Sequence, residues 1–282
     1  MSGTSPDFSA WIGRTETVHD SLSAEHARLA AATLDSEVTS VTAGSLLPPL
    51  WHWFYFLPHA PQSALDVDGH PHRGGFLPPI PYPRRMFAGS RMQFHRALRL
   101  GQPATREGEI RNVTMKSGRS GNLAFVTVGY RFHQDGVLCI DEEQDIVYRE
   151  PGGIVAAPTP APLPTPDAAV WSRTITPDAR LLFRFSALTF NAHRIHYDRP
   201  YARDDEGYPG LVVHGPLTAI LLAELVRRHT TQPIASFDFR GLAPLFDLAP
   251  FHLIGRCDDT TVTLEALAPD LTPALSARCT LG

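Results

Sequence analysis

The segment from Gly215 to His229 constrains the fold of this chain more than any other part of the sequence. It has the spacing of a helix, and leucine, isoleucine, valine and alanine occupy nearly all of its faces. Such a helix cannot lie on a surface with one side in water, so other elements must enclose it. Four strand candidates follow it, at residues 234–240, 251–256, 261–267 and 274–280. The pattern therefore predicts a helix wrapped by a curved antiparallel sheet.

The N-terminal half repeats this order of elements. A helix is predicted at residues 23–34, and strands are predicted at residues 91–100, 107–114, 123–132 and 137–148. Two segments that begin at Arg91 and Ser236, 145 residues apart, also share their pattern of apolar and polar residues. One helix wrapped by an antiparallel sheet, twice over, is a double hot-dog. We therefore predict an α+β fold, a double hot-dog with two antiparallel sheets, each wrapped around a central helix.

A long proline-rich stretch lies between the first helix and the first of these strands. Residues 46–85 hold nine prolines interleaved with an aromatic run at residues 51–56. A structureless loop of this length is unusual unless it is functional, so we expect an ordered excursion packed over a surface. The aromatic run either covers the first sheet or lines an acyl pocket. The segment that holds His70 and His72 is interpreted as a turn.

We divide the chain into three parts. The first is an N-terminal hot-dog with the proline-rich insertion (residues 1–155), expected to be non-catalytic. The second is a proline-rich linker (residues 156–172), whose composition predicts an extended segment. The third is a C-terminal hot-dog (residues 173–282), which begins with an expected strand at residues 181–188 and carries the candidate catalytic loop.

Composition excludes several classes of function. The formal net charge is −4, so the chain lacks the basic balance typical of nucleic-acid binding. Lys116 is the only lysine, which excludes a Walker phosphate loop and leaves a single candidate for a Schiff base, in a polar turn. The apolar runs fall short of the ~18 residues that a membrane span needs. We therefore expect no nucleic-acid partner and no membrane association.

Two further features bear on the location of the protein. The three cysteines Cys139, Cys257 and Cys279 are widely spaced and odd in number, which is typical of a reducing compartment. The N-terminal residues lack the basic and apolar regions of a secretory signal. The bias toward arginine and alanine favours a GC-rich bacterial source. We therefore expect a cytoplasmic bacterial protein.

The densest cluster of polar residues precedes the buried helix. The candidates within it are Asn191, His193, Arg194, His196 and Asp198. Loops held by a rigid scaffold host function more often than cores do, and so many titratable groups in one loop indicate a site. The helix that follows has a proline in its first turn, which pre-sets its start. Its free N–H groups would suit an oxyanion.

This cluster resembles a known motif. Residues 186–198 and 210–217 are similar to the hydratase-2 motif of MaoC-like enoyl-CoA hydratases and dehydratases. Residues 77–90 and 142–150 resemble the double hot-dog branch that includes mesaconyl-C4-CoA and itaconyl-CoA hydratases and type 2 hydroxyacyl-thioester dehydratases. The resemblance covers nearly the whole chain. It implies reversible addition of water to a double bond conjugated to a thioester, with an acyl-CoA substrate and no further cofactor, since coenzyme A is part of the substrate.

The resemblance assigns roles residue by residue. His196 fills the position of the catalytic histidine, whereas the position of the aspartate five residues before it holds Asn191. An asparagine can orient a water molecule but cannot exchange a proton as a carboxylate does. We therefore expect His196 to act as general base toward a water oriented by Asn191. Either His193 or Asp198 is expected to handle the second proton.

The start of the buried helix is the expected substrate-binding position. There, His214 precedes Gly215, and the backbone N–H of Gly215 is expected to stabilise the enolate-like oxygen of the thioester. If the substrate carries a second carboxylate, Arg194, Arg84 and Arg85 are the candidates to bind it. The pair Arg84 and Arg85 could also be solvated rather than bind a ligand.

Several alternatives remain open at this stage. His193, His196, Asp198 and His214 could together bind zinc, but their spacing does not match the helical zinc signature and no cysteine lies nearby, so we expect no metal. The enzyme could instead be a 3-hydroxyacyl-thioester dehydratase of fatty acid or polyketide metabolism, acting on coenzyme A or acyl carrier protein. A thioesterase and a non-catalytic acyl-CoA-binding module are the other classes, because a fold does not choose its chemistry. Both a monomer and a homodimer are consistent with a double hot-dog.

Overall fold

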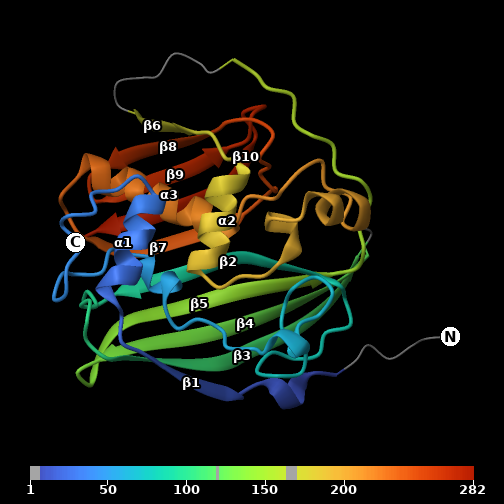
Figure 1. The fold of residues 1–282 in the computed structure, drawn as a ribbon, viewed down its shortest axis with the longest axis horizontal. Coiled ribbons are helices and arrows are strands. Elements are labelled where there is room, and N and C mark those ends of the chain that lie inside the picture. Colours follow the sequence, from blue (N-terminus) through green and yellow to red (C-terminus); the bar gives the residue numbers. More distant parts are fainter. Residues whose placement is uncertain (1–6, 119–120, 163–169) are drawn as a thin grey trace.

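A computed structural model describes residues 7–118, 121–162 and 170–282. Within these residues, ten strands form one continuous antiparallel sheet in the order β1-β3-β4-β5-β2-β7-β10-β9-β8-β6 (Figure 1). The strands are β1 (Thr15–Asp20), β2 (Arg84–Phe94), β3 (Ala104–Gly118), β4 (Gly121–Gln134), β5 (Val137–Arg149), β6 (Val170–Ile175), β7 (Ile234–Gly241), β8 (Phe251–Asp258), β9 (Thr261–Leu267) and β10 (Pro273–Leu281). The helices are α1 (Ala24–Thr33), α2 (Ala179–Leu188) and α3 (Gly215–His229).

The two expected sheets are joined into one, so that part of the prediction is wrong. In the sheet, β2 lies at the edge of the N-terminal half and β7 at the edge of the C-terminal half, and these two strands pair antiparallel. Without this pairing, each strand would present an open row of backbone N–H and C=O groups. Joining them satisfies both edges within a single chain.

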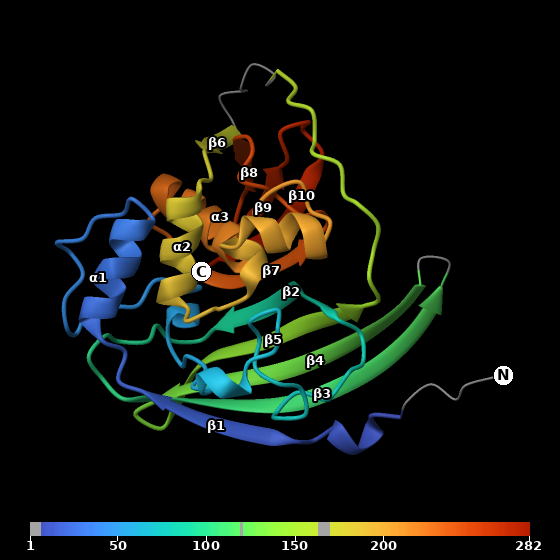
Figure 2. The same ribbon diagram turned by 45° about the vertical axis from the view of Figure 1, so that its right-hand side comes forward.

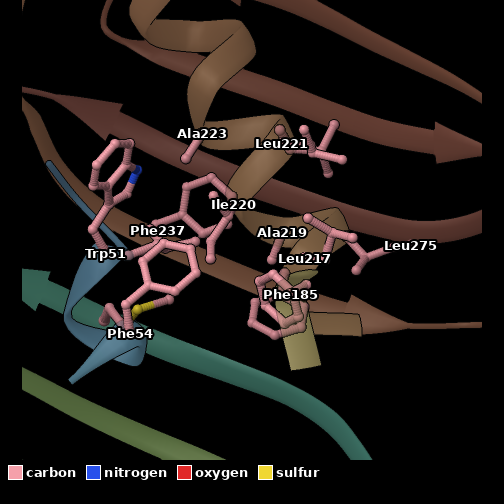
Figure 3. Packing of buried hydrophobic residues seen from close by; sticks show 14 of the residues in the cluster. Trp51, Phe54, Phe185, Leu217, Ala219, Ile220, Leu221, Ala223, Phe237 and Leu275 are labelled. Atoms are coloured by element: carbon pink, nitrogen blue, oxygen red, sulfur yellow. The ribbon is translucent and has the colours of Figure 1, made fainter. Parts of the chain in front are cut away.

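The enclosed helix was predicted correctly. In α3, every residue from Leu217 to Val226 is buried, and the helix packs against β6, β8, β9 and β10. Figure 3 shows side chains of α3 lying among Phe185 of α2, Phe237 of β7 and Leu275 of β10. Because the sheet curves around it (Figure 2), apolar residues on all sides of the helix leave water.

The N-terminal half departs from the expected plan of one wrapped helix per half. Here α1 packs mainly against α2 and the short 3₁₀-helix η2 (Trp51–Phe54) rather than within its own sheet. The buried face of α1 consists of alanines and a threonine, which have too little volume to fill a curved sheet. Members of the aromatic run lie on this sheet instead: the rings of His52 and Phe56 contact Phe132 of β4, and Nε1 of Trp53 donates to Glu142 of β5. The aromatic run therefore does cover the first sheet.

Three local predictions also need correction. The segment expected as a strand at residues 181–188 is part of α2, which begins after Asp178, whose side chain accepts the N–H of Leu181. This cap outweighs the β-like run of leucine and phenylalanine, because it satisfies an orphan N–H of the first helical turn. The linker expected at residues 156–172 ends earlier, since β6 begins at Val170. Its residues 163–169 lie outside the described residues. The strand expected at residues 91–100 is displaced toward the N-terminus, as β2.

No helix in the described part of the chain is both long and apolar enough to cross a membrane. The cysteines Cys139, Cys257 and Cys279 are all free thiols.

Candidate active site

A cavity of about 1080 Å³ lies between the two halves of the chain. The N-terminal half contributes part of the proline-rich excursion together with residues of β2 and β5, and the C-terminal half contributes the end of α2, the loop that follows it and the start of α3. Trp53 lines the cavity, so the aromatic run has a second role beside its packing role. A partly apolar cavity of this size, with a few converging polar groups, is typical of a small-molecule site.

The loop after α2 brings three of the predicted residues to this cavity. Asn191 follows Phe190, which adopts a left-handed conformation, and donates its N–H to the carbonyl of Ser186. Its side-chain Oδ1 accepts the N–H of His193 at 3.0 Å, which fixes the asparagine and leaves its NH₂ group as a donor. The 3₁₀-helix η4 (Arg194–His196) then ends on His196. Asn191, His193 and His196 all line the cavity.

The hydrogen bond of His196 identifies its basic nitrogen. Nδ1 lies 2.7 Å from the carbonyl oxygen of Val212, which can only accept, so Nδ1 carries the proton. The other nitrogen, Nε2, is therefore unprotonated in the neutral ring. Burial lowers the pKa of His196 to about 4, so the ring is neutral at physiological pH. A neutral imidazole with a free Nε2 is suited to take a proton from water.

His214 packs against the face of the His196 ring. The two rings stack with centroids 3.6 Å apart, and Nε2 of His214 is hydrogen-bonded to Oγ of Ser186 at 2.9 Å. Burial lowers the pKa of His214 well below its ordinary value, and the neighbouring His196 adds to this effect. Burial therefore holds both rings neutral, and a charge on one ring would further oppose a charge on the other. The predicted substrate-binding role of His214 stays a prediction, although it does line the cavity.

Gly215 begins α3 at the wall of the same cavity. The first N–H groups of a helix have no acceptor within the helix, so they point toward any group that lies beyond its end. A side chain at this position would meet only the carbonyl of Phe87, at 3.8 Å, so the glycine leaves the approach to these N–H groups open. The location fits the predicted oxyanion position.

Two predicted site residues, Arg194 and Asp198, lie outside the cavity. They pair with each other one helical turn apart, through Nε and Nη2 of the guanidinium at 3.0 and 2.8 Å from Oδ2. Hydrogen bonds from Arg194 and from the N–H of Tyr201 lower the pKa of Asp198. A carboxylate satisfied in this way at the surface is poorly placed to exchange a proton with a substrate.

Two arginines predicted to bind the substrate do line the cavity, but they differ in their partners. Arg84 is buried and forms an ion pair with Glu206 at 2.9 Å, so its charge is already neutralised. Arg85 lies over the ring of Tyr148 and has no acidic partner among the described residues. Arg149 of β5, which the sequence did not single out, also lines the cavity without an acidic partner in the described part of the chain. Arg85 and Arg149 are therefore the charges available to an anionic ligand.

Sequence reasoning also missed Asp68 and His70 of the proline-rich excursion, where His70 begins the segment interpreted as a turn. Oδ2 of Asp68 lies 3.1 Å from Nδ1 of His70, and the ring of His70 lies 4.1 Å from that of His193. The only available signal was the density of histidines in this proline-rich segment. The donor atoms of Asp68, His70 and His193 lie within 4.8 Å of one another. Positive charge from Arg85 and Arg73 acts on His70, however, and this charge disfavours a bound cation.

Comparison with known proteins identifies relatives over the whole chain. Residues 50–247 match the family described as hydroxyacyl-thioester dehydratase type 2. Over 279 residues, which cover 99% of each chain, the sequence is 66% identical to the mesaconyl-C(4)-CoA hydratase of Chloroflexus aurantiacus. The predicted resemblance and the predicted hydro-lyase class are therefore confirmed.

Solved structures share the fold. A MaoC-like dehydratase superposes with a TM-score of 0.73 at 13% identity, covering 96% of this chain and 98% of that one. A double-hotdog protein of Mycobacterium tuberculosis superposes with a TM-score of 0.60 at 15% identity, covering 96% of both chains. The double hot-dog architecture is thus confirmed, in the form of one continuous sheet. By its sequence and its fold, the chain belongs to the hydroxyacyl-thioester dehydratase type 2 family.

Proposed function

We propose that this protein adds water reversibly to the double bond of mesaconyl-C4-CoA or a closely related enoyl-CoA thioester. One observation carries the proposal: His196, Asn191 and Gly215 face one cavity, and the bond from Nδ1 of His196 to the carbonyl of Val212 leaves Nε2 basic. The 66% identity to a mesaconyl-C(4)-CoA hydratase, over 99% of both chains, supports this choice of substrate.

In the mechanism, His196 acts as general base. Its Nε2 takes a proton from water while the water oxygen attacks the carbon β to the thioester. The NH₂ group of Asn191 is placed to hold that water oxygen, since its Oδ1 is already bonded to His193. Negative charge moves to the thioester oxygen, where the N–H of Gly215 stabilises it. General base catalysis and an oxyanion donor typically contribute rate factors of about 10² or more each.

The arginines account for the charge of the substrate. Mesaconyl-C4-CoA carries a free carboxylate at the end of its acyl group, and Arg85 and Arg149 are the cavity arginines without an acidic partner among the described residues. A guanidinium binds a carboxylate through two parallel hydrogen bonds, which gives both affinity and orientation. We therefore assign the free carboxylate to Arg85 and Arg149. Arg84, which was also expected to bind this carboxylate, is paired with Glu206 instead.

The wider predictions belong to the same proposal. We expect a cytoplasmic enzyme that acts on a small acyl-CoA without a metal or further cofactor. Because β2 and β7 pair within one chain, the central sheet needs no second copy to close it. A monomer and a homodimer formed through another surface are both compatible with this fold.

A spectrophotometric assay tests the proposed function. Mesaconyl-C4-CoA, itaconyl-CoA and crotonyl-CoA are offered separately to the wild type and to His196→Ala, and both the enoyl-thioester absorbance and free thiol are followed. We expect loss of the absorbance without thiol release, fastest with mesaconyl-C4-CoA, and a loss of at least about 10² in rate for His196→Ala. Release of free thiol instead would show a thioesterase and overturn the proposal.

A further inference from the structure

The proposed mechanism needs a second proton-handling group. As water loses one proton, the α-carbon of the substrate must gain one. Asn191 stands where the family places a carboxylate and cannot supply a proton. Asp198, the other candidate in the loop, is bound to Arg194 away from the cavity. His193, the remaining candidate of this loop, does line the cavity, but burial lowers its pKa, so its ring is neutral and it is not an acid in its own right.

An acid–imidazole pair reaches the cavity from the other half of the chain. Asp68 and His70 belong to the proline-rich excursion, and His70 lines the cavity. Both carboxylate oxygens of Asp68 contact His70. Oδ1 accepts the backbone N–H of His70 at 2.8 Å, and Oδ2 lies 3.1 Å from the ring nitrogen Nδ1. The carboxylate thus holds the ring in one orientation and leaves Nε2 for the cavity. Although burial opposes it, the bond from His70 holds the pKa of Asp68 below its usual value, so the carboxylate is ionised.

The excursion is built closely onto the catalytic loop. The N–H of Arg194 donates to the carbonyl of Asp68 at 2.9 Å, and its Nη1 donates to the carbonyl of Val67 at 3.0 Å. Gly69 approaches the loop so closely that a Cβ there would lie 1.8 Å from the carbonyl oxygen of Ala192. Its φ of +91° is also one that glycine adopts readily. Contacts of this kind fix Asp68 and His70 relative to the reacting groups.

The two halves are connected by a row of imidazoles. The ring of His70 lies 4.1 Å from that of His193, which lies 5.4 Å from that of His196. All three line the cavity. Histidine is the side chain best suited to pass protons near neutral pH. The row therefore offers a route between the general base and the Asp68–His70 pair.

Resting on the function proposed above, we propose that His70 is the group that protonates the α-carbon and that Asp68 is its positioning residue. In hydration, the water oxygen bonds to the β-carbon as one of its O–H bonds breaks, and that proton passes to Nε2 of His196. The electrons of the double bond move to the thioester, and the α-carbon then takes the Nε2 proton of the His70 imidazolium. His193 returns the proton from His196 to His70. One water is added, and the protein regains its starting protonation.

The charges that face His70 define how its proton affinity depends on its surroundings. Burial is the largest effect on His70 and, together with Arg85 and Arg73, it holds the pKa of His70 below its ordinary value, while Asp68 acts to raise this pKa and His193 lies against the ring. A substrate carboxylate bound at Arg85 would offset the positive charge there and favour the imidazolium. Without the charge of Asp68, the pKa of His70 falls further, so the imidazolium loses its proton at a lower pH. The rate, which depends on this imidazolium, must then begin to fall at a lower pH on its alkaline side.

The test compares His70→Gln, Asp68→Asn and the control His72→Gln in the hydration of mesaconyl-C4-CoA. His72 lies two residues away, with an exposed side chain bonded to Asp66. We expect His70→Gln to lower kcat by about 10² to 10⁴ with little change in KM. Asp68→Asn should shift the alkaline limb of kcat to lower pH, which a purely structural role would not do. His72→Gln should match the wild type.

Each contrary result has a distinct meaning. A kcat for His70→Gln within about threefold of the wild type, with unchanged circular dichroism, overturns the proposal. Equal loss for Asp68→Asn at every pH overturns the role of Asp68. A stoichiometric metal ion whose removal abolishes activity overturns both roles, since the ion would occupy these groups. The proposed function fails separately, if the wild type does not hydrate any of the three thioesters.

Discussion

The imidazole rings of His196 and His214 stack face to face, with centroids 3.6 Å apart and planes inclined by 19°. His196 is fixed at its edge by Val212 and on its face by His214, which is itself anchored to Ser186. Val212, His214 and Ser186 together thus set the position of the base.

Mutation of Ser186 tests the hydrogen bond that holds His214 in this stack. Ser186→Ala removes the partner of Nε2 of His214 and leaves a buried nitrogen unsatisfied, so we expect the free energy of unfolding to fall by about 1–3 kcal/mol. We also expect a lower kcat, because His196 loses a fixed neighbour. Urea unfolding and steady-state kinetics measure the two effects. Ser172→Ala, at an exposed position of β6, is the control and should change neither. A variant as stable as this control would contradict the importance of the anchor.

The buried histidines predict a loss of stability in acid. Burial lowers the pKa of His193, His196 and His214, whereas an unfolded histidine titrates near 6.5. Below that value the unfolded chain binds protons that the folded chain does not, so stability falls as the pH decreases. With a folded pKa of about 4, His196 alone accounts for roughly 3 kcal/mol between neutral pH and pH 4.

Urea unfolding across this range of pH measures the effect. The free energy of unfolding should fall steadily from pH 7 toward pH 5, and the fall should be smaller for His196→Asn, which has no proton to gain. His72→Gln should keep the slope of the wild type, because that side chain is exposed. A slope that is identical in all three proteins would be inconsistent with a neutral, buried His196.

Arg84 and Arg85 are adjacent in sequence, but we expect their replacement to have different effects. Arg85→Gln should raise KM for mesaconyl-C4-CoA about 10-fold or more, the value of one charged hydrogen bond, with little change for crotonyl-CoA, which lacks the second carboxylate. Kinetics with both substrates separates binding of the carboxylate from general damage. An equal effect on both substrates would contradict the assignment.

Arg84→Gln should act on the fold instead. The side chains of Arg84 and Glu206 are both largely buried, and removing one partner leaves the other charge unpaired. Loss of one member of such a pair typically costs about 3–5 kcal/mol. Thermal unfolding should therefore show a clear drop for Arg84→Gln and a small one for Arg85→Gln. The reverse order would show that Arg84, not Arg85, is the free charge.

Much of the fold was predictable because apolar periodicity is a local property. The enclosed helix α3 and most strands follow directly from it. The likeness between the segments at Arg91 and Ser236 proves informative as well: the same offset relates Met92 to Phe237, and the structure pairs these two residues directly at the centre of the sheet. The joining of two sheets through this pair was not predictable, since strand pairing between distant segments leaves no local pattern.

The site was predictable only where its residues are close in sequence. Asn191, His193, His196 and Gly215 lie within one stretch, and their density of polar groups marked them. Asp68 and His70 are more than a hundred residues away in sequence, in a segment whose prolines indicate a turn. Arg149 sits in a strand, where its alternation indicates only an exposed position. Tertiary packing alone brings these residues to the cavity.

The close approach of Gly69 to the catalytic loop gives the sharpest test of how the two halves build one site. In Gly69→Ala, the new Cβ would collide with the carbonyl of Ala192, and the positive φ would be strained. The excursion must then move away from the loop and carry His70 with it. Because a displacement of about 1 Å can lower a rate by about 10², we expect a loss of this order in kcat. Gly75→Ala, where no atom lies within 4 Å of the new Cβ, should be neutral. Equal rates for the two variants would mean that the excursion does not set the geometry of the reaction.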